Sequence, residues 1–170
     1  MKDNWGRFIF YAALLIIQIV LSGYVNVGPY IYLCCLPLIV IYLPLYQETS
    51  LSMLIAFGCG LLVDILCDGI MGLNAAAAVA LAAVRKPLFA AFFTKDSVER
   101  AIFPTIRDTG VMRHINFILS SLLVYFIVYI CLDSVGMESF QTTLLRLVLS
   151  CAANLAIILA IDYFMFNARR

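Results

Sequence analysis

The chain has 170 residues, of which 65% are hydrophobic and only 12% charged, and its formal net charge is +1. So few charged side chains cannot cover the surface of a water-soluble domain of this size, which predicts a protein that lies in a lipid bilayer. The composition leaves no room for a separate soluble domain, and the near-neutral charge argues against nucleic acid as a partner.

Six apolar runs, bounded by glycine, proline and charged residues, predict an all-α bundle of about six transmembrane helices. The first run is long enough to cross the membrane and ends without a small-x-small cleavage pattern, so we expect it to be retained as a helix. The bundle is expected to form a single domain over residues 1–170. The expected spans are residues 8–25, 30–46, 50–66, 71–84, 115–132 and 143–166.

Two of these spans are expected to be irregular. The second contains Pro37 and Pro44, which predict a kink. The fourth meets Arg85, Lys86 and Pro87 after 14 residues, a helix of about 21 Å at 1.5 Å per residue. Either Arg85 and Lys86 extend their side chains to the membrane surface, or the bilayer thins around this span.

The connection over residues 85–114 is the longest between two spans. Its apolar and aromatic residues are interspersed with charged ones, which is typical of short helices lying on a membrane surface. Two interpretations stay open: a connector anchored among lipid headgroups, or a docking surface for a cytoplasmic partner. His114, at the end of this loop, is expected at the membrane edge.

The basic residues are segregated. With six crossings, ten of the eleven Lys and Arg residues fall on one side of the membrane. The loops on the other side, residues 26–29, 67–70 and 133–142, contain none. The positive-inside rule therefore predicts that both termini and the 85–114 loop are cytoplasmic.

The end of the third span and the start of the fourth contain polar residues that are expensive inside a membrane. Asp64 and Asp68 are four residues apart and share a helix face, and Asn74 can cap or bridge where the next helix begins. Glycines in this stretch are expected to allow close helix packing and a flexible turn. These glycines are Gly58, Gly60, Gly69 and Gly72.

A second polar stripe lies on the sixth span, where Arg146, Ser150 and Asn154 recur every four residues. In the expected topology, Arg146 lies at a depth similar to that of Asp64 and Asp68. We therefore predict an ion pair between the third and sixth spans. It either holds the bundle together or forms a site coupled to a ligand or partner.

The sequence does not predict catalysis. Its six cysteines form no CxxC pair and its single histidine has no acidic neighbour, which argues against a zinc site or a general base. Asp68-Gly69 resembles the start of the acidic signature of membrane phosphatidyltransferases, but the Ala-Arg that must follow is missing. We expect a protein that is not an enzyme and has no catalytic residue, metal or cofactor.

The stretch GCGLLVDILCDGIMGLNAAAAVALAAVRKPL, residues 58–88, resembles the signature region of the MreD family of rod shape-determining membrane proteins. In that family a Gly-Leu-Leu-x-Asp run ends one helix and a Gly-Leu-x-Ala run opens the next. These runs correspond here to residues 60–64 and 72–75. The chain length, the six expected spans, the basic central loop and the Leu-Arg-Leu around Arg146 fit the same family.

The resemblance implies a non-enzymatic scaffold of the cell-wall elongation complex in the bacterial inner membrane. Its partners would be an MreC-like single-span protein, the synthases RodA and a class B penicillin-binding protein, and, indirectly, the MreB filament, with lipids around it. It also implies a bundle similar to the substrate-binding subunits of energy-coupling-factor transporters. The alternative function is therefore a vitamin-binding subunit of such a transporter, although Ala12 is followed four residues later by Ile16 rather than by the Ala typical of those subunits.

Overall fold

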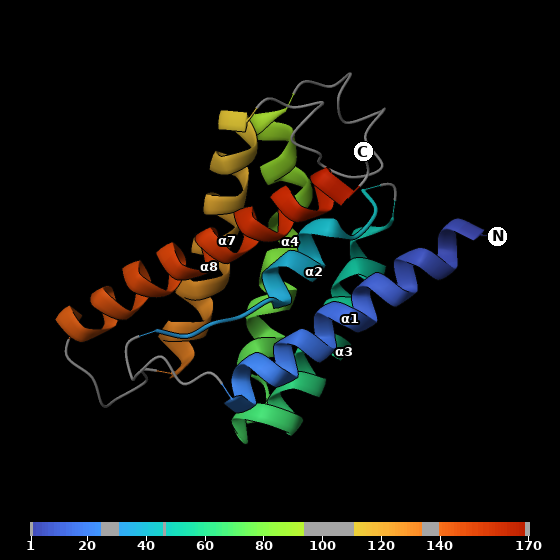
Figure 1. The fold of residues 1–170 in the computed structure, drawn as a ribbon. Helices are drawn as coiled ribbons and strands as arrows, with labels where there is room; N and C mark the ends of the chain where they lie inside the picture. Colours follow the sequence, from blue (N-terminus) through green and yellow to red (C-terminus); the bar gives the residue numbers. More distant parts are fainter. Residues whose placement is uncertain (1, 25–30, 46, 94–110, 134–139, 169–170) are drawn as a thin grey trace.

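The structure, a computed structural model, describes residues 2–24, 31–45, 47–93, 111–133 and 140–168 (Figure 1). These residues form helices and no strand, which confirms the expected all-helical class. The elements are α1 (Lys2–Tyr24), α2 (Leu36–Tyr42), α3 (Thr49–Val63), the π-helical turn η1 (Asp64–Asp68), α4 (Leu73–Phe92), α7 (Val111–Asp133) and α8 (Phe140–Ala168).

Four apolar stretches within the described residues are long enough to cross a membrane. α1 adds a shorter apolar stretch, Ile9–Ser22. Large apolar side chains are exposed on the helices, with Ile16 of α1 62% exposed and Leu54 of α3 66% exposed. Such surfaces suit lipid rather than water, so the chain is a membrane protein. The four stretches are Thr49–Cys67, Leu73–Phe92, Val111–Asp133 and Gln141–Ile161.

The long helices pack in series, α3 against α4, α4 against α7, and α7 against α8. The short helix α2 contacts α1, α3, α4 and α7, so it lies at the centre of the bundle. In the view of Figure 1, α1 and α8 cross the near side of the bundle on either side of α2. Residues 36–41 of α2 are all buried and form much of the apolar core.

Helices α3 and α4 approach each other closely at Gly60. A Cβ atom added to Gly60 would lie 2.5 Å from the Cα of Ala75, so the two backbones touch where Gly60 stands. The turn between the helices uses Gly69 and Gly72, whose φ angles of 69° and 103° lie in the left-handed region that favours glycine. Gly58 has no atom within 4 Å of its added Cβ, so it makes no close contact within the described bundle.

The second expected span is not one kinked helix. Residues 31–35 have no regular secondary structure, and only Leu36–Tyr42 are helical. Pro37 occupies the first turn of α2, where its missing N–H is tolerated, and Pro44 follows the end of the helix. We call residues 31–44 the broken segment.

The expected end of the fourth span is also corrected. α4 continues through Arg85, Lys86 and Pro87 to Phe92, and Arg85 is 1% exposed rather than extended to the membrane surface. Phe89 and Phe93 pack with Phe117 of α7, which holds this end of α4 against its neighbour. His114, in the first turn of α7, is likewise buried. The surface helices expected after residue 93 fall on residues 94–110, outside the described residues.

Candidate functional site

Buried polar side chains from three helices bind the broken segment, whose first half has no helical hydrogen bonds of its own. In α8, Ser150 Oγ accepts a hydrogen bond from the Tyr32 N–H at 3.0 Å. Asn154 Oδ1 accepts from the Cys34 N–H at 2.7 Å, and its Nδ2 donates to the Tyr32 carbonyl at 2.7 Å. Non-helical backbone at membrane depth is tolerated only where the protein supplies such partners.

Helix α1 supplies the next partner along the broken segment. The Cys35 N–H donates to Oε1 of Gln18, whose Nε2 donates to Ser22 at 3.0 Å. Gln18 is fully buried, as are Ser150 and Asn154 at 1% exposure. Side chains of α1 and α8 therefore satisfy the backbone N–H and carbonyl groups of this stretch, as the backbone of a neighbouring strand does in a sheet.

Arg85 binds the other end of the broken segment. Its Nη1 donates to the carbonyls of Val40 and Leu43, both at 2.7 Å, and its Nη2 donates to Pro44 at 3.0 Å. Tyr11 of α1 donates to the carbonyl of Tyr42 at 2.9 Å. A cation at a helix C-terminus also complements the helix dipole, so Arg85 anchors α2 by both charge and hydrogen bonding.

Asp64 holds the start of α4. Its Oδ1 accepts from the backbone and side-chain nitrogens of Asn74, both at 2.9 Å. Its Oδ2 accepts from the N–H groups of Gly72 at 2.9 Å and Ala75 at 3.1 Å. These are first-turn donors that no carbonyl within the helix can reach. Asp64, fully buried, thus caps α4 from the end of the preceding helix.

Asn74 connects this cap to the broken segment. Its Oδ1 accepts from the Tyr125 hydroxyl at 2.6 Å, and its Nδ2 donates to the Tyr32 hydroxyl at 3.1 Å. The Cys34 thiol lies 3.2 Å from the Tyr125 hydroxyl. Tyr32 also stacks on Tyr129, with ring centroids 4.5 Å apart. One network therefore joins α4, α7 and the broken segment.

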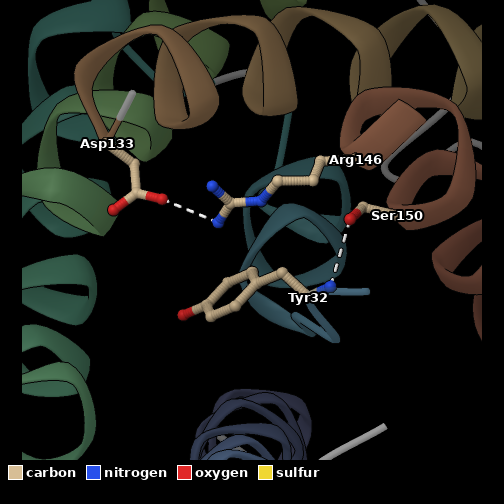
Figure 2. Close-up of polar contacts among 4 residues, drawn as sticks. All are labelled: Tyr32, Asp133, Arg146 and Ser150. Carbon is tan, nitrogen blue, oxygen red and sulfur yellow. Dashed lines mark hydrogen bonds and ion pairs between the residues drawn. The ribbon is translucent and has the colours of Figure 1, made fainter. Parts of the chain in front are cut away.

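The predicted ion pair between the third and sixth spans is wrong for Asp64. Arg146 instead pairs with Asp133, the last residue of α7, at 2.7 Å between Nη2 and Oδ2. Figure 2 shows the guanidinium directed at the Asp133 carboxylate, with Arg146 one turn of α8 before Ser150. Asp133 is a neighbour in the α7–α8 hairpin, whereas Asp64 is already surrounded by the donors of α4. The side chain of Asp68 lies outside the described residues.

Several functional residues were missed by sequence reasoning, namely Arg85, Gln18, Tyr32 and Tyr125. A signal existed for Arg85 and Gln18, since each is a strongly polar residue within or next to an apolar run. Pro37 and Pro44 signalled that the second span would leave carbonyls and N–H groups for such residues to bind. Spacing along one helix does not identify the partner on another, so the pairings needed the structure.

A scan against protein-family models finds no match, and searches of curated proteins and of solved structures find none either. Within the described residues, no three His, Cys, Asp or Glu side chains come together as a metal site. The polar groups described above bind backbone and one another.

Proposed function

We propose that the chain is a membrane scaffold of the bacterial cell-wall elongation complex, similar in role to the MreD family. It binds the transmembrane helix of an MreC-like protein and couples the wall synthases outside the membrane to the actin-like filament inside. The chain acts by holding these partners together and not by catalysis.

The observation that carries this proposal is that Asp64 binds the start of α4. It is the aspartate of the family-like Gly-Leu-Leu-x-Asp run, and its carboxylate accepts four hydrogen bonds from residues 72–75, which include the family-like Gly-Leu-x-Ala run. Gly60, the first residue of the same run, touches Ala75. The residues that carry the resemblance thus join α3 to α4. A rigid pair of helices of this kind supports a role as a scaffold.

The proposal includes six crossings with both termini in the cytoplasm and a bundle similar to the substrate-binding subunits of energy-coupling-factor transporters. The broken segment would be the second crossing and α1 the first. Segregation of the basic residues supports this orientation. The exposed apolar side chains on α1, α3 and α8 offer surfaces for partner helices within the membrane.

The test is depletion of the protein in a rod-shaped host, with rescue by a tagged copy. We expect depleted cells to swell and become round, and the tagged protein to recover an MreC-like partner from detergent-solubilised membranes. A copy with Gly60→Ala should fail in both assays, and the matched Gly58→Ala copy should succeed. Normal rods after depletion would contradict the scaffold.

The alternative, a vitamin-binding transporter subunit, needs polar groups that can turn toward a small molecule. Asp64 and Asn74, two of the polar residues that would line such a pocket, are instead hydrogen-bonded within the bundle. Recovery of a pair of transporter ATPases, in place of an MreC-like protein, would overturn the scaffold and support the transporter.

A further inference from the structure

Helix α8 has two different attachments to the bundle. It packs along α7, and it reaches the broken segment through Ser150 and Asn154. Its spanning stretch is the least buried of the four, with 22% of its residues buried compared with 44% for α7. Because α8 has less apolar burial than α7, its attachment to the bundle depends more on its hydrogen bonds to the broken segment.

The amide of Asn154 takes the place of a peptide group beside residues 32–34. It accepts from the N–H of Cys34 and donates to the carbonyl of Tyr32, and its second N–H donates to the carbonyl of Ser150 in its own helix at 2.8 Å. Ser150 accepts from the N–H of Tyr32. If α8 moved away, two N–H groups and a carbonyl of the broken segment would lose these partners in a place without water.

We infer that α8 and the non-helical stretch 31–35 form one cooperative latch, in which neither keeps its position without the other. Opening of α8 releases the stretch, and release of the stretch loosens α8. Because the far end of the broken segment is held by Arg85 and Tyr11, the latch lets a change at α8 reach α1 and α4 through α2.

Native cysteines report on both halves of the latch. Cys34 and Cys35 in the stretch are 1% and 2% exposed, Cys151 in α8 is 5% exposed, and Cys131 at the end of α7 is exposed. The purified full-length protein in lipid nanodiscs is treated with N-ethylmaleimide, and labelling is followed at each cysteine by mass spectrometry. In the wild type we expect fast labelling at Cys131 and slow labelling at the other three.

Each decisive variant changes one half of the latch, and cysteine labelling is then measured in the other half. Asn154→Leu removes two of the three hydrogen bonds between α8 and the stretch, and should raise the labelling rate of Cys34 and Cys35 about tenfold. Gln18→Leu removes a partner on α1 without touching α8, and should raise labelling of Cys151. Ser150→Ala should give a smaller rise, and Ala156→Leu, on the exposed face of α8, should give none.

Hydrogen exchange of the wild-type protein tests the latch without any substitution. The amides of residues 32 and 34 should exchange at the same rate as those around residue 154, and faster than those in the middle of α4. Protected Cys34 and Cys35 in Asn154→Leu, or different exchange rates for the two halves, would overturn the latch. These measurements involve no partner protein, so they fail or succeed separately from the scaffold.

Discussion

At the scale of single residues, Asp64 illustrates how a charge is made compatible with a membrane bundle. A buried carboxylate needs donors on both oxygens, and each oxygen of Asp64 accepts two hydrogen bonds from the first residues of α4. The pattern of Asp64 and Asn74 was visible in the sequence, because a polar pair on either side of a glycine turn is unusual between apolar runs. Their direct contact was not predicted, since it depends on how the turn folds.

Asp64→Asn should destabilise the protein strongly. The amide nitrogen would replace one carboxylate oxygen and face N–H groups, either those of Gly72 and Ala75 or those of Asn74. These buried donors would then have no acceptor. We expect a loss of about 2–4 kcal/mol in the free energy of unfolding, measured by denaturation in mixed micelles. Asp133→Asn is the matched control: its side chain is 24% exposed, and a pair of this kind is worth less than about 1 kcal/mol. Equal losses in the two variants would show that the capping role is wrong.

Arg85 is the second residue whose role is specific to its position. Arg85→Met removes the donors of the Val40, Leu43 and Pro44 carbonyls at the end of α2. We expect it to lower the free energy of unfolding by about 2–3 kcal/mol, and Arg85→Lys to fall in between, since an ammonium does not reproduce the planar fork of donors.

The control for Arg85 is its neighbour Lys86, which is half-buried. Lys86→Met should change the free energy of unfolding by less than about 0.5 kcal/mol in the same assay. If Lys86→Met were as damaging as Arg85→Met, the effect would come from losing any cation at this depth and not from the anchoring of α2.

At the scale of the elements, the pairing of α3 with α4 depends on one glycine. Gly60→Ala places a methyl group 2.5 Å from the Cα and 2.7 Å from the N of Ala75. Because these are backbone atoms, the helices must separate, and such overpacking costs about 1–3 kcal/mol. Gly58→Ala, half a turn earlier, meets nothing within 4 Å and should stabilise the helix by up to about 1 kcal/mol. The opposite signs are checked by thermal unfolding of the two variants, and a stable Gly60→Ala protein would refute the close contact.

The helices that the sequence predicted well are those whose apolar runs are long and uninterrupted. Residues 115–132 and 143–166 were expected to be helical, and α7 and α8 contain both ranges. The prediction failed where a local signal competes with tertiary contacts. The fourth span was expected to end at residue 84, before two basic residues and Pro87, but packing of Phe89 and Phe93 in the apolar core lets α4 continue to Phe92. Residues 31–35 leave the helical state because Gln18, Ser150 and Asn154, distant in sequence, offer their backbone other partners.

At the scale of the whole molecule, the broken segment decides how many times the chain crosses the membrane. Extended residues rise about 3.3 Å each and helical residues about 1.5 Å. Residues 31–34, drawn out in Figure 1, and the eight residues from Cys35, whose backbone is already helical, to Tyr42 therefore cover up to about 25 Å, close to the roughly 30 Å of a hydrocarbon core. Twelve residues can thus replace a helix of about 20, because the extended half gains length and its backbone is hydrogen-bonded by α1 and α8.

Reporter fusions test this crossing directly. If the broken segment crosses, a fusion after Asn26 should read extracytoplasmic and one after Glu48 cytoplasmic, because the two positions flank it in sequence. Fusions after Gly69 and Glu138 should match Asn26, and fusions after Lys95 and Arg170 should match Glu48. The same compartment for Asn26 and Glu48 would make the segment re-entrant. The remaining helices would then give an odd number of crossings and place the termini on opposite sides, which contradicts the segregation of ten basic residues on one face.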